Sequence, residues 1–72
     1  MKRKAPWTDY AGNDVYVGDY IVHPNGERGV VVVSPEDHLP DTDKWLVYYG
    51  GQIMSRLCLQ IGDKGMAVVE GV

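Results

Sequence analysis

Short runs of β-branched and aromatic residues alternate with turn residues along the chain, the pattern typical of β-strands. In "KWLVYY" a period of two places Trp45, Val47 and Tyr49 on one face and Lys44, Leu46 and Tyr48 on the other. The four valines after Gly29 predict a strand buried on both faces, or with one face covered by a loop. The predicted strand segments are residues 15–23 (two segments or one bent strand), 29–34, 44–49, 52–60 and 66–70.

Turn signals separate these runs. The stretch "HPNGERG" predicts a turn because proline cannot donate to a ladder and Asn25-Gly26 tolerates positive φ. Gly50-Gly51 predicts a two-residue hairpin, and residues 35–43 predict an acidic loop. No stretch has a convincing helical period. The pattern therefore predicts an all-β, five-stranded, SH3-like antiparallel barrel, since closure removes exposed sheet edges.

The chain has 72 residues, which predicts one domain of limited stability. We expect residues 1–10 to form a flexible basic N-terminal arm and residues 11–72 to form the barrel. The sequence has one cysteine and no long apolar run, and we expect no signal peptide because no apolar stretch follows the basic residues of "MKRKAPWTDY". These features predict a cytoplasmic protein without a membrane segment, in the host cytoplasm if the protein is viral.

The net charge is −3, with seven basic and ten acidic residues. Three of the seven are Lys2, Arg3 and Lys4, so the rest of the chain is clearly acidic. A duplex-binding domain normally has a basic face, because phosphate contacts dominate its affinity. The charge distribution therefore argues against nucleic acid as the main partner, and it leaves room for secondary contact by the basic arm.

Candidate chemistry is sparse. His23, His38 and Cys58 are far apart and lack zinc-ligand spacing, so we expect no metal site. The acidic loop lacks the glycine and closing glutamate of a calcium loop. The serines and threonines have no evident base partner, and "NGERG" lacks the ending of a phosphate-binding loop. We therefore expect neither catalysis nor a cofactor.

Aromatic residues are more informative: the chain has two Trp, five Tyr and no Phe. Tyr and Trp suit half-wet interfaces because they combine an apolar body with a polar tip. Both faces of "KWLVYY" carry an aromatic side chain, so one face is core and the other faces water or a partner. A covered barrel with aromatics at its rim and a binding surface both fit this pattern.

Two blocks of the sequence carry a resemblance to a known family. The first block is "GDYIVH" at residues 18–23, and the second comprises Trp45, Leu46, Val47, Tyr49, Gly50 and Gly51. Together they resemble the KOW-type and Tudor-like barrels of transcription factors, and more closely the RNA-polymerase-interacting domain of CarD-type regulators and the transcription-repair coupling factor. The resemblance covers residues 17–61. The chain departs from the family at Asn25-Gly26 and in "MSRLCLQ". We expect no counterpart of the DNA-contacting helical domain that accompanies this barrel in CarD.

The resemblance implies a non-catalytic transcription regulator that docks on RNA polymerase through an edge strand, by β-augmentation. A free-standing domain of this size also resembles small phage proteins that bind host RNA polymerase and act as inhibitors or antiterminators of transcription. We expect a monomer that modulates initiation or termination. The expected contact residues are Lys44, Trp45, Val47, Tyr49 and Arg56, with Lys2, Arg3 and Lys4 as an electrostatic arm.

Two other functions also fit the sequence. A KOW-type nucleic-acid-binding module would show affinity that falls steeply with salt. A structural or assembly protein of a phage would form a stable oligomer. A proline-peptide SH3 module is the least favoured, because the chain has no "ALYDY"-like segment and no paired tryptophans.

Overall fold

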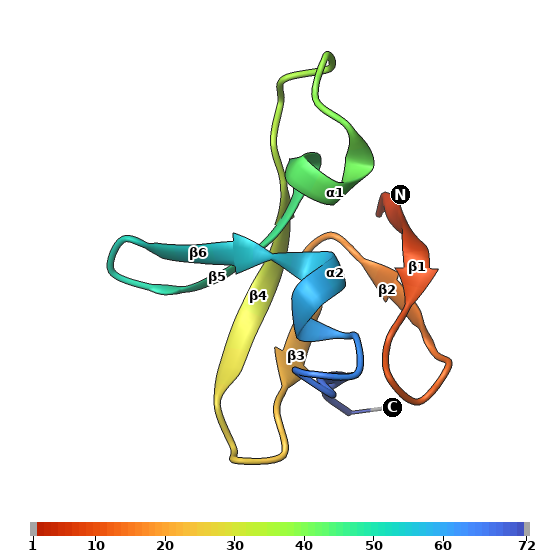
Figure 1. Ribbon diagram of the computed structural model, residues 1–72, viewed down its shortest axis with the longest axis vertical. Helices are drawn as coiled ribbons and strands as arrows, with labels where there is room; N and C mark the ends of the chain where they lie inside the picture. Colours follow the sequence, from red (N-terminus) through yellow and green to blue (C-terminus); the bar gives the residue numbers. More distant parts are fainter. Residues whose placement is uncertain (1, 72) are drawn as a thin grey trace.

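The computed structural model describes residues 2–71, which form seven short strands and two single-turn helices (Figure 1). The elements, in chain order, are β1 Lys4–Thr8, β2 Asp14–Tyr16, β3 Tyr20–Val22, β4 Arg28–Val33, α1 Asp41–Lys44, β5 Trp45–Gly50, β6 Ile53–Arg56, α2 Leu57–Gln60 and β7 Val68–Val69.

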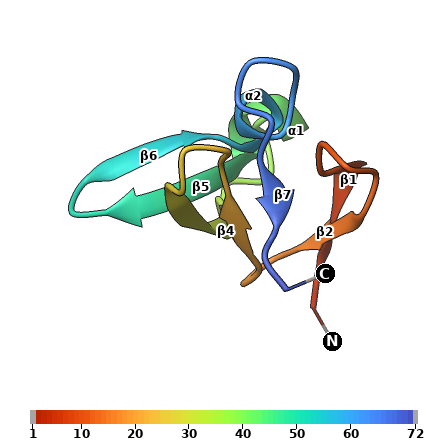
Figure 2. The same cartoon turned by 90° about the horizontal axis from the view of Figure 1, so that it is seen from below.

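The strands form two antiparallel sheets. Five strands pair in the order β6-β5-β4-β3-β7, and β1 pairs with β2 in a separate sheet. The prediction of a mostly β domain with a five-stranded antiparallel sheet is confirmed. The closed SH3-like barrel is only roughly matched, because β6 and β7 are edge strands that do not pair with each other within residues 2–71. Figure 2 shows the β5–β6 hairpin extending away from β1, β2 and β7.

The predicted return strand over residues 52–60 is wrong in its second half, where the chain forms α2. Leu57 and Ile61 are four residues apart, so one helical turn points both side chains inward, and both are buried. The same turn leaves Leu59 57% exposed, whereas a continued strand would have placed it on the same face as Leu57. The helical turn therefore buries Leu57 and Ile61 without Leu59, and β6 ends at Arg56.

The predicted strand at residues 44–49 begins one residue later, because residues 41–44 form α1 after Pro40. The sequence allowed residues 15–23 to form either two strands or one bent strand. The chain forms two separate strands here, β2 and β3, which confirms the first alternative. The β5–β6 hairpin is confirmed, with its loop shifted by one residue to Gly51-Gln52. Gly50 and Gly51 have φ of 105° and 59°, a left-handed conformation that glycine adopts without steric cost.

The N-terminal segment belongs to the fold, which corrects the expectation of a flexible arm over residues 1–10. Lys4–Thr8 form β1, Ala5 is 2% exposed, and Trp7 packs against the core. The backbone N–H of Val17 also donates to the carbonyl of Arg3 at 2.9 Å. Ala5 and Trp7 supply apolar surface that covers the sheet, so this segment docks despite its basic residues. Met1 lies outside the described residues.

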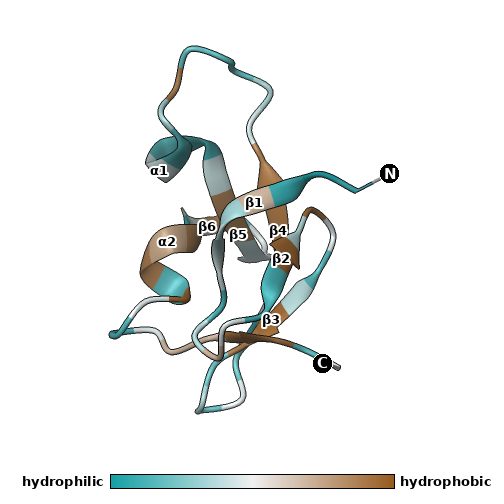
Figure 3. Cartoon of the chain, turned by 90° about the vertical axis from the view of Figure 1, so that its right-hand side faces the viewer, coloured by the Kyte–Doolittle hydropathy of each residue, from teal (hydrophilic) through white to brown (hydrophobic). Residues whose placement is uncertain are grey.

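The core lies between the inner face of the five-stranded sheet, the β1–β2 pair and α2. Figure 3 shows the apolar stretches of β3, β4 and α2, and the polar loop before α1. The buried apolar residues are Ala5, Val15, Ile21, Val31, Trp45, Val47, Leu57, Ile61, Ala67 and Val69. Val47 and Tyr49 pack directly against the backbone of Gly29. A Cβ at this position would lie 2.5 Å from Val47 Cγ1 and 2.8 Å from the Tyr49 ring, so only glycine fits here. No helix within residues 2–71 has the length and apolar character needed to cross a membrane.

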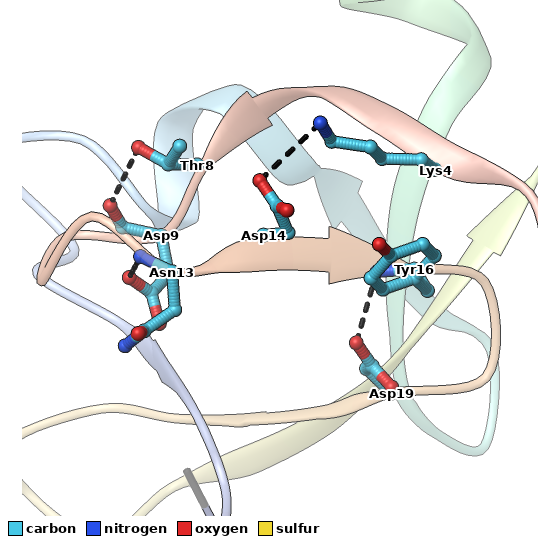
Figure 4. A network of polar contacts seen from close by, with 7 residues as sticks. All are labelled: Lys4, Thr8, Asp9, Asn13, Asp14, Tyr16 and Asp19. Carbon is cyan, nitrogen blue, oxygen red and sulfur yellow. Dashed lines mark hydrogen bonds and ion pairs between the residues drawn. The ribbon is translucent and has the colours of Figure 1, made fainter.

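Asp9 is only 4% exposed and ties the β1–β2 turn to β7. Figure 4 shows its contacts with Thr8 and Asn13. Oδ1 accepts hydrogen bonds from the backbone N–H of Ala11 and Asn13, and Oδ2 accepts from the backbone N–H of Val69 at 2.8 Å and from the Asn13 side chain. Burial alone would raise the pKa of Asp9, but these hydrogen bonds to the charged form together lower the pKa below its usual value of 3.8. The carboxylate thus joins segments 60 residues apart.

Candidate functional site

The expected contact residues of "KWLVYY" lie mostly inside the protein. Trp45 and Val47 are 1% and 0% exposed, and Lys44 is 8% exposed. Tyr49 is partly buried against the core, and only Arg56 is exposed, where it pairs with Asp43 at 2.9 Å. The prediction that Lys44, Trp45 and Val47 contact a partner is therefore wrong for this fold. The structure does not bring the five residues together on one surface.

The two faces of β5 explain this error. The period of two was predicted correctly, and the face with Trp45, Val47 and Tyr49 packs on the core. The opposite face carries Tyr48, which is 37% exposed, and Leu46, which is half-buried. The strand by itself has aromatics on both sides. Only the packing of α2 and β1–β2 against one side determines which side is left open.

The predicted electrostatic arm is only partly free to act on a partner. Lys4 pairs with Asp14 at 3.4 Å, and the Arg3 guanidinium lies 5.6 Å from the centre of the Trp45 ring (Figure 4 shows the Lys4–Asp14 pair). Lys2 is exposed. Exposed ion pairs contribute at most about 1 kcal/mol, so Lys4 remains able to exchange its partner.

The outer face of the five-stranded sheet exposes a row of apolar and aromatic side chains that the sequence analysis did not select. Tyr20, Val30, Tyr48 and Met54 are direct neighbours across β3, β4, β5 and β6. Directly opposed residues of antiparallel strands point to the same face. Tyr20, Tyr48 and Met54 are 49%, 37% and 53% exposed. The sequence indicated Tyr48 on the second face of β5. It could not indicate the other members of the row, because the register between strands decides which residues lie side by side.

The edge strand β6 continues this apolar surface. It pairs with β5 on one side and has no strand on its other side within residues 2–71. Ile53 and Met54 are 63% and 53% exposed, an unusual degree of exposure for large apolar side chains on a sheet edge. Arg56 is the only charged residue of this strand, and its guanidinium is paired with Asp43. The edge therefore offers backbone hydrogen-bonding groups beside exposed apolar side chains.

A polar network links the sheet to α2 and to the loop that follows it. His23 Nδ1 lies 3.0 Å from the carbonyl oxygen of Gly65 and donates to it, because a carbonyl can only accept. The Tyr49 hydroxyl oxygen lies 2.6 Å from His23 Nε2 and 2.8 Å from Gln60 Oε1, and its single proton is donated to one of the two. Burial, followed by the negative charge of Glu27, raises the pKa of Tyr49 to about 12. His23 thus has a structural role within the fold.

Replacing Tyr49 with phenylalanine should lower the free energy of unfolding by about 1–2 kcal/mol, because His23 and Gln60 each lose a hydrogen-bond partner. The raised pKa also predicts alkaline sensitivity. The contribution of this hydroxyl is fully present below pH 10 and is lost as the pH rises towards about 12. Urea denaturation of both proteins at neutral and alkaline pH measures the effect. Equal loss of stability above pH 10 in the two proteins would contradict the assignment.

Metal-ligating and nucleophilic side chains are dispersed. Within residues 2–71 no three His, Cys, Asp or Glu side chains gather in a way that could hold a metal ion. Cys58 is a half-buried free thiol in α2, which corrects its expected place in a strand. His38 lies in the exposed loop before α1.

Comparison with known proteins adds no assignment to this geometry. A scan against protein-family models and searches of curated proteins and of solved structures found no match.

Proposed function

We propose that this protein is a non-catalytic, protein-binding transcription regulator that docks on RNA polymerase by adding a polymerase strand to the edge of β6. The observation that supports strand addition is the open edge of β6 with its exposed Ile53 and Met54. In such complexes main-chain hydrogen bonds provide affinity, and alternate side chains provide selectivity. The resemblance of residues 18–23 and 45–51 to polymerase-interacting domains supports the choice of partner.

The charge distribution favours protein over nucleic acid as the partner. Arg28 and Arg56, at the ends of β4 and β6, are each paired with a carboxylate, at 2.7 Å and 2.9 Å respectively. A phosphate-binding face requires cations that are available to the backbone of the nucleic acid. The regulator would act in the cytoplasm of the cell that contains the polymerase, by occupying a surface that initiation or termination requires.

Replacing Met54 with lysine should reduce affinity for core RNA polymerase at least about ten-fold, because a charge beside an open edge opposes strand addition. Met54→Lys retains the fold, since the side chain is 53% exposed. Co-elution of the protein with core polymerase on a sizing column, at moderate and at high salt, measures the effect.

Leu59→Lys provides the matched control. It makes the same charge change at an apolar side chain that is 57% exposed, but Leu59 belongs to α2 and not to strand β6. We expect this variant to co-elute like the unmodified protein. Absence of co-elution of the unmodified protein at either salt would refute polymerase as the partner, and equal losses in the two variants would refute the β6 edge as the docking site.

A further inference from the structure

A hollow of about 270 Å³ lies on the outer face of the sheet, on β3, β4 and β5. Tyr20 and Tyr48 form two of its walls, and Val30, which lies between them in register, forms its floor. The backbones of Gly29 and Gly50, which carry no side chains, also line it. Pockets for drug-sized molecules occupy about 300–1,000 Å³, so this hollow is suited to one or two side chains.

The spacing of the walls suits a single ring. Tyr20 and Tyr48 are each directly opposed to Val30, so they lie two strand spacings apart, on the order of 10 Å. Side chains stand roughly perpendicular to a sheet, so both tyrosines rise from the same surface with Val30 between them. Subtracting the thickness of two rings leaves room for about one more ring between them. The hollow therefore fits a flat or compact ring better than a branched aliphatic side chain.

Both walls are held in position before any ligand arrives. The Arg28 guanidinium lies 4.6 Å from the centre of the Tyr20 ring and is itself fixed by Glu70 through two contacts of 2.7 Å. The Tyr48 hydroxyl donates a hydrogen bond to the carbonyl oxygen of Gly51 at 2.9 Å. Fixed walls lower the ordering cost of binding.

The charges around the hollow determine the class of ligand. Arg28 is the only basic residue that lines it, and a bidentate carboxylate already occupies its guanidinium, so an anionic group finds no available cation. A cationic group would meet the guanidinium at close range. An uncharged ring on an extended segment avoids both problems, because it needs no cation and is not repelled by the guanidinium. Proline-bearing segments bind aromatic-lined grooves in this way because their polyproline II conformation is already formed.

We propose that the slot between Tyr20 and Tyr48 binds a proline ring presented by an extended, uncharged segment of a partner protein. The residues that line the slot belong to β3, β4 and β5, so binding there does not require strand addition to β6. The Tyr20 hydroxyl, on a side chain that is 49% exposed, can donate to a carbonyl of the same segment. Sequence motifs alone favour proline recognition least, whereas the shape and charge of the slot support it.

The test is a titration of the ¹⁵N-labelled full chain with an oligoproline peptide, followed by the amide shifts of Gly29, Val30 and Gly50. We expect saturable shifts at these amides, and at least about ten-fold weaker binding by Tyr48→Ala and Tyr20→Ala. Tyr48→Phe keeps the ring and should bind within a few-fold of the unmodified protein. Tyr10→Ala is the matched control, because Tyr10 is 50% exposed and lies outside the five-stranded sheet.

Three results would overturn the proposal: no shift at these amides up to the solubility limit of the peptide, equal shifts with a glycine-serine peptide of the same length, or an equal loss of binding in Tyr10→Ala. Preferential shifts with single-stranded oligothymidine would assign the slot to base stacking and would also overturn it. The titration uses oligoproline alone and the co-elution uses core polymerase, so failure of proline binding and failure of polymerase docking are distinguishable.

Discussion

Replacing Trp45 with alanine should lower the free energy of unfolding by about 3–5 kcal/mol, the range for removal of a large aromatic side chain from a core. Trp45 is 1% exposed and is the largest fully buried side chain of the described chain. A domain of this length has a total stability of about 4–11 kcal/mol. The variant should therefore be close to unfolding, and chemical denaturation followed by circular dichroism measures the change.

Tyr48→Ala is the control for this prediction, because it removes an aromatic side chain from the same strand at a position that is 37% exposed. Its loss of stability should be below that of Trp45→Ala by about 2 kcal/mol or more. A cooperative transition of Trp45→Ala at the denaturant midpoint of the unmodified protein would contradict the assigned burial. The result also bears on function, because any loss of binding by Trp45→Ala would reflect lost folding rather than a lost contact.

The second large effect concerns Asp9, whose replacement by alanine should cost about 3–5 kcal/mol. The change leaves the backbone N–H groups of Ala11, Asn13 and Val69 without their acceptor. Each buried unsatisfied donor costs about 1–3 kcal/mol, and water can reach part of the turn. Asp14→Ala is the matched control, since that exposed carboxylate makes only the ion pair with Lys4.

The pH dependence of stability gives an independent readout. The pKa of Asp9 is lowered on folding, so its contribution is fully present above pH 3.8 and is lost as the pH falls through the lower, folded pKa. The difference in free energy of unfolding between the unmodified protein and Asp9→Ala should therefore shrink below pH 3.8. A difference that stays constant down to strongly acidic pH would show that the carboxylate is not held in its charged form.

Burial and exposure also change how the candidate site is interpreted. Of the five contact residues chosen from the sequence, Trp45 and Val47 maintain the core, and Arg56 is exposed at the end of the β6 edge. The open surface instead comprises Tyr20, Tyr48 and Met54, which three different strands contribute. Mutations intended to test binding should therefore be made on this face.

The sequence by itself determined the local structure. β-Branched and aromatic runs define β3, β4 and β5, because these side chains fit a pleated, half-buried surface. Asn25-Gly26 and Gly50-Gly51 define turns, because their backbone must enter conformations that few residues adopt. Alternation in β5 correctly separated its two faces. Each of these inferences depends on residues that are close together in the chain.

Tertiary structure decided which face of β5 is core, whether the N-terminal residues dock, and where β6 ends. Lys4–Thr8 become a strand only because β2 pairs with them, and residues 57–60 form a helical turn that buries Leu57 and Ile61 against distant segments while Leu59 stays exposed. The Tyr20–Tyr48 slot exists only through the register of three strands. These outcomes depend on surface that distant segments remove from water, and that free energy cannot be assigned to any one stretch of sequence.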